Sequence, residues 1–84
     1  MAALDNKMAS ILREDLSEIQ LELNRKRNEV SNLKVGYVRA VEGAGMIPAE
    51  PLRRNLIAAR AELTDIEERV AALQRQLSEA EQAN

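Results

Sequence analysis

The sequence predicts an all-α protein folded as an antiparallel αα-hairpin, that is, a two-stranded coiled coil made from one chain. Three observations predict this fold. The helix-breaking residues gather near the middle of the chain, and apolar residues recur with alternating spacings of four and three on both sides of that break. The two apolar seams also match each other when the chain is folded back. Two such hairpins could pack together as a four-helix bundle.

The first helix is expected over about residues 4–42. From Leu12 onward its apolar residues alternate spacings of four and three, and Lys26 is the single polar exception. This spacing places one narrow apolar seam along the helix. Before Leu12 the pattern changes to Leu4, Met8 and Leu12, with steps of four, which predicts a local shift of the coiled-coil register.

The turn is expected at about residues 43–48. Four of the five glycines and prolines fall between Gly43 and Pro51, whereas Gly36 is isolated within a helical pattern. Gly43 suits the position after a helix, where a residue often takes a left-handed conformation. A proline suits the first turn of the next helix, because its missing N–H would have no partner there. The second helix is therefore expected at about residues 49–82, and the whole chain forms a single hairpin.

The two seams match across the turn. In an antiparallel hairpin, residues that face each other have numbers with a nearly constant sum. Pairs such as Leu16 with Leu77 give 93, and the pairs between them, such as Leu33 with Ala59, give 92. The predicted hairpin seam consists of Leu12, Leu16, Ile19, Leu23, Val30, Leu33, Tyr37, Leu56, Leu63, Ile66, Val70, Leu73 and Leu77.

Charged residues beside the seam favour this register only in part. Arg13 is expected to face Glu81 with opposite charge, whereas Glu29 is expected to face Glu62 with like charge. An exposed ion pair is worth only about 0.2–1 kcal/mol, so the apolar seam must set the register.

Lys26 occupies a seam position and allows two interpretations. Its methylene groups can lie along the seam while its ammonium reaches Glu67 or Glu22, which is the interpretation we favour. Alternatively, Lys26 fixes the register and orientation of the helices at some cost in stability.

Apolar residues outside the seam are the candidate partner contacts, because contiguous exposed apolar surface often marks an interaction site. They are Val35, Val38, Val41, Met46, Ile47, Ile57, Leu4 and Met8. The alternative is that Met46, Ile47 and Ile57 fold over the turn and only cap the hairpin.

Composition excludes several classes of function. The 84 residues include no cysteine and no histidine, which excludes disulfides, Cys/His zinc sites and histidine general-base catalysis. A formal net charge of -2 argues against a general nucleic-acid or membrane binder. The carboxylates fall on outer helix positions, and the glycines near residue 43 are too few for a phosphate loop. We therefore expect a protein that is not an enzyme, with no cofactor, no metal and no small-molecule substrate.

The stretches Asp15–Leu33, Val38–Gly45, Pro48–Leu56 and Ile66–Leu73 resemble the coiled-coil hairpin of large serine recombinases, the serine integrases. The likeness lies in the length of the helices, in the residues that precede the turn, and in the prolines at the start of the second helix. It covers about residues 12–80. The catalytic and zinc-binding parts of that family have no counterpart here, so the resemblance implies an excised module or a remnant.

The resemblance implies a function in DNA recombination. Hairpins of that family make contacts between subunits through their tips and help decide which recombination sites synapse. Carried onto this sequence, the resemblance assigns the contact to Val41, Met46, Ile47 and Ile57.

Three functions remain open from the sequence. The first is a protein–protein interaction module, acting by self-association or on a protein partner. The second is a free-standing small regulator, such as a phage-type inhibitor, and the third is a nucleic-acid-binding hairpin dimer. Under the first interpretation nucleic acid is contacted only indirectly. No apolar run approaches the ~18 residues that span a bilayer, and no signal peptide is visible, so we expect a cytoplasmic protein without membrane contact.

Overall fold

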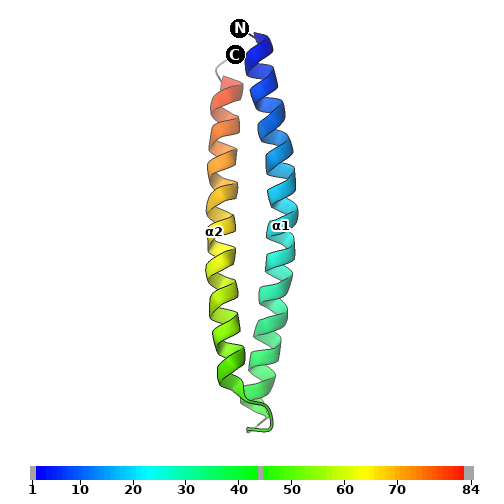
Figure 1. Ribbon diagram of the computed structural model, residues 1–84, viewed down its shortest axis with the longest axis vertical. Helices are drawn as coiled ribbons and strands as arrows, with labels where there is room; N and C mark the ends of the chain where they lie inside the picture. Colours follow the sequence, from blue (N-terminus) through cyan, green and yellow to red (C-terminus); the bar gives the residue numbers. More distant parts are fainter. Residues whose placement is uncertain (1, 44, 83–84) are drawn as a thin grey trace. The chain divides into compact units, whose positions relative to one another are not determined.

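A computed structural model describes residues 2–43 and 45–82, with side chains described from Lys7 onward. Within these residues the protein is an all-α helical hairpin without strands, as the sequence predicts (Figure 1). Helix α1 runs from Ala2 to Glu42 and helix α2 from Ala49 to Gln82.

The hairpin divides into two units that are described separately. The open-end unit combines the α1 residues up to Leu23 with the α2 residues from Ile66 onward. The turn unit runs from Asn24 to Asp65 and contains the connection between the helices.

The connection is short and depends on two glycines. The N–H of Gly43 donates to the carbonyl of Arg39 at 2.9 Å, and the N–H of Met46 donates to the carbonyl of Gly43 at 3.2 Å. A Cβ on Gly43 would lie only 3.1 Å from that Arg39 oxygen, so a side chain would crowd the last turn of α1. The left-handed residue is Gly45, with φ of 89°, and not Gly43 as the sequence led us to expect. Gly43 still donates the helical hydrogen bond to Arg39, and the left-handed residue follows two residues later.

The core of the turn unit is made by the inner faces of both helices. Ala40, Leu56 and Ala59 are buried, with 1–3% of their surface exposed. Leu33 and Ala59 line the same shallow surface groove, so the two helices meet there in the register that the seam pattern predicts. The remaining seam residues of this unit are half-buried, namely Val30, Leu33, Tyr37, Leu52 and Leu63.

The open-end unit has its own apolar core. Its buried residues are Ala9, Leu12, Leu23, Ile66 and Val70, and its half-buried seam residues are Leu16, Ile19, Leu73, Leu77 and Ala80. Ala9 is 3% exposed, whereas Met8 is 54% exposed. The expected register shift before Leu12 is therefore wrong. Ala9 lies three residues before Leu12, so its burial continues the four-three spacing.

Candidate interaction surface

Nine large apolar side chains of the described residues are exposed. Six belong to the turn unit, namely Val35, Val38, Val41, Met46, Ile47 and Ile57, and three to the open-end unit, namely Met8, Ile11 and Leu21. All sequence-predicted contact candidates with described side chains are in this group, and the side chain of Leu4 lies outside the described residues. The turn unit therefore carries most of the exposed apolar surface that the hairpin seam does not use.

The apolar residues in and beside the connection differ in exposure. Met46 is 87% exposed, and Ile47 and Ile57 are each about half exposed. The backbone N–H of Met46 donates to the carbonyl of Gly43, while the Met46 side chain is exposed. Met46 therefore does not fold over the turn, whereas Ile47 and Ile57 are half covered and keep about half of their surface available for contact.

A second exposed apolar group lies along the last three turns of α1. We name it the valine face and define it as Lys34, Val35, Val38, Val41 and Glu42. Four of these residues, all but Val41, line one shallow groove together with Ser31 and Arg39. The three valines are 41–56% exposed. The neighbouring residues Tyr37 and Ala40 belong to the seam and turn toward α2. The valine face thus points away from the partner helix.

Lys26 joins the two helices within the turn unit. Its Nζ donates to the Oε2 of Glu29 at 2.8 Å and to the Oε2 of Glu62 at 2.5 Å. The side chain itself is 18% exposed. The ammonium therefore does leave the seam, as expected, but its partners are not Glu67 or Glu22. Glu29 lies one helical turn further along α1, on the same side of the helix as Lys26, and this places it within reach.

The Lys26 bridge also explains how Glu29 and Glu62 tolerate each other. The sequence predicts that these two like charges face each other, and the structure places one ammonium on both of them. The hydrogen bond to Glu29, followed by the one to Glu62, raises the pKa of Lys26 from 10.5 to about 12, although partial burial works in the opposite direction. Lys26 consequently stays charged throughout the physiological range.

Three further ion pairs of the described residues lie on the surface. Arg13 and Glu81 join the two helices of the open-end unit at 3.9 Å, in the pairing that the sequence predicts. Glu50 lies in the first turn of α2, where a negative charge is favourable, and contacts both Arg53 and Arg54 at 3.5 Å. These groups are more than half exposed, so each pair contributes little to stability.

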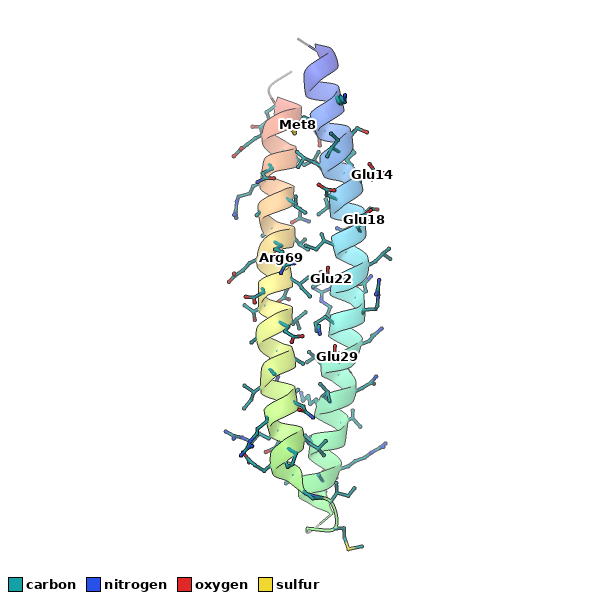
Figure 2. All side chains as sticks on the ribbon, viewed as in Figure 1. Met8, Glu14, Glu18, Glu22, Glu29 and Arg69 are labelled. Carbon is teal, nitrogen blue, oxygen red and sulfur yellow. The ribbon has the colours of Figure 1, made fainter. Side chains whose placement is uncertain are left out.

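Carboxylates follow one another along α1 without forming a site for a metal ion. Glu14, Glu18 and Glu22 succeed each other at intervals of four residues (Figure 2). Among the described residues, no group of three or more acidic side chains is placed to hold a metal ion. In the same part of the chain, neither helix has a stretch long and apolar enough to cross a membrane.

Comparison with known proteins adds no assignment. The chain matches no protein-family model, no curated protein and no solved structure. The function of the hairpin must therefore be inferred from its own surface.

Proposed function

We propose that this hairpin is a protein–protein interaction module without catalytic activity. The observation that carries the proposal is the group of six exposed large apolar side chains in the turn unit. Exposed apolar residues scattered singly are ordinary, but a group of them beside a short connection is typical of a contact surface. The partner is a protein, either a second copy of this chain or a different molecule.

Burial of the exposed apolar side chains near the connection contributes a favourable free energy to association. Full burial of a large apolar side chain is worth about 1.5–3 kcal/mol. Met46, Ile47 and Ile57 each have half or more of their surface still to bury. Covering these three therefore gives a few kcal/mol, which offsets only part of the freedom that two molecules lose on binding, so the contact must also bury further apolar surface of the turn unit.

The first test removes the apolar side chains of the connection. The double variant Met46→Glu with Ile47→Glu should lower the mean mass in sedimentation equilibrium or light scattering, because two charges cannot be buried in an apolar contact. Leu21→Glu is the matched control, since Leu21 is 62% exposed but lies in the open-end unit. If the double variant keeps the mass of the unchanged protein, the connection has no part in self-association.

A narrower role within this function is contact between subunits in site-specific DNA recombination. It is supported by the resemblance of the sequence to the hairpin of large serine recombinases. A chimera in which this hairpin replaces that of such a recombinase should still bring two recombination sites together in a DNA-bridging assay. Met46→Glu with Ile47→Glu should abolish the bridging, and a chimera that binds DNA but never bridges it would contradict this role.

A further inference from the structure

We propose that the valine face recognises a second copy of this chain, which packs against it with α1 antiparallel to α1 and a two-fold axis at Val38. This inference rests on the proposed function and names the partner. It is independent of the connection residues Met46 and Ile47, and so the two can fail separately.

The valine face is arranged symmetrically around Val38. Val35 and Val41 are three residues away from it on either side, and Lys34 and Glu42 are four residues away. At 100° per residue, the two outer valines lie about 60° to either side of Val38 and the two charged residues about 40°. The five side chains therefore form one continuous surface about 120° wide, which is the width of a helix face that packs against a neighbour.

A two-fold axis at Val38 matches the face to itself. In an antiparallel pair centred there, Val38 meets its own counterpart and Val35 meets Val41 of the other copy. Lys34 of each copy then lies at the same level along the helix pair as Glu42 of the other copy, so the dimer contains two such pairs of opposite charge. One axis thus brings apolar residues to apolar residues and places a positive charge at the level of a negative charge.

Charge selects this direction of packing. Within the described residues, neither Lys34 nor Glu42 forms an ion pair. A parallel arrangement would place Lys34 beside Lys34 and Glu42 beside Glu42, and like charges at close range are unfavourable. A uniformly acidic or basic partner helix would satisfy one end of the face and be repelled at the other. The second copy, running antiparallel, suits both ends.

The test reverses one charge at a time. Lys34→Glu and Glu42→Lys are each measured alone by sedimentation equilibrium, and then as an equimolar mixture. Each variant alone should raise the dissociation constant of the dimer roughly tenfold, since two attractive pairs become two repulsive ones. The mixture should return to about the affinity of the unchanged protein, because its heterodimer restores an opposite charge at every contact.

Two controls separate this outcome from loss of fold. Arg25→Glu reverses a charge in the same unit but away from the valine face, and should leave the dissociation constant unchanged. Circular dichroism at each concentration should show unchanged helix content, and Glu42→Lys even places a cation at the end of α1, where the helix dipole favours it.

Three outcomes would overturn the inference. The unchanged protein could stay monomeric at its highest soluble concentration, the single variants could dimerise as tightly as the unchanged protein, or the mixture could be no heavier than its components. A dimer that survives both charge reversals but dissociates with Met46→Glu and Ile47→Glu would overturn this arrangement and leave the proposed function standing.

Discussion

At the scale of single residues, Lys26 shows how a polar side chain is accommodated in an apolar seam. Its stem lies against the seam, and its ammonium binds one carboxylate from each helix. The sequence indicates that the ammonium must leave the seam, but it does not single out the carboxylates that receive it. Glu22 and Glu29 both lie about one helical turn from Lys26 along α1, and only the tertiary structure selects Glu29 from α1 and Glu62 from α2.

The raised pKa of Lys26 gives a pH dependence with a definite sign. The folded state holds the Lys26 proton more tightly than the unfolded chain does, so this stabilisation is complete below pH 10.5 and is lost as the pH rises to about 12. Urea unfolding should therefore show the unchanged protein losing more stability across that range than the variant Lys26→Met. Equal losses for the two proteins would show that the ammonium bridge does not stabilise the fold.

At the scale of the elements, the three glycines have different structural roles although they are the same residue type. Gly43 allows close approach to the Arg39 carbonyl, and Gly45 takes the left-handed conformation that reverses the chain. Gly36 does neither, because it lies within α1 and an added Cβ would meet no atom within 4 Å. The sequence pattern predicts the position of the turn, but the left-handed residue depends on where the last hydrogen bond of α1 forms.

Two alanine substitutions should act in opposite directions. Gly36→Ala should stabilise the hairpin by about 0.5–1 kcal/mol, because alanine is the better helix former and the space is open. Gly45→Ala should destabilise it by about 1–2 kcal/mol, because a side chain is strained at a φ of 89°. The midpoints of urea unfolding measure both changes. A loss of stability with Gly36→Ala would mean that this glycine has a packing role that the open space does not reveal.

At the scale of the whole molecule, the two units share one construction principle. Each is held by a narrow seam whose buried residues include small ones, such as Ala40 and Ala59, and large ones, such as Leu56 and Ile66. Other seam residues, such as Leu16 and Leu63, remain half-buried, since one neighbouring helix covers a side chain from one side only. A hairpin of this kind gains by packing against further helices, which agrees with an interaction surface on its outer faces.

The sequence by itself determined the all-α hairpin. Alternating spacings of four and three define one apolar side of each helix, and one group of helix breakers allows one reversal of the chain. The tertiary structure alone decided that Lys26 binds Glu29 and Glu62, that Ala9 continues the seam in place of Met8, and that the side chain of Met46 is left exposed. The reason is that the periodicity of apolar residues sets which side of a helix a side chain lies on. Which residues that side chain contacts depends on the distances between the two helices and on the conformation of the connection.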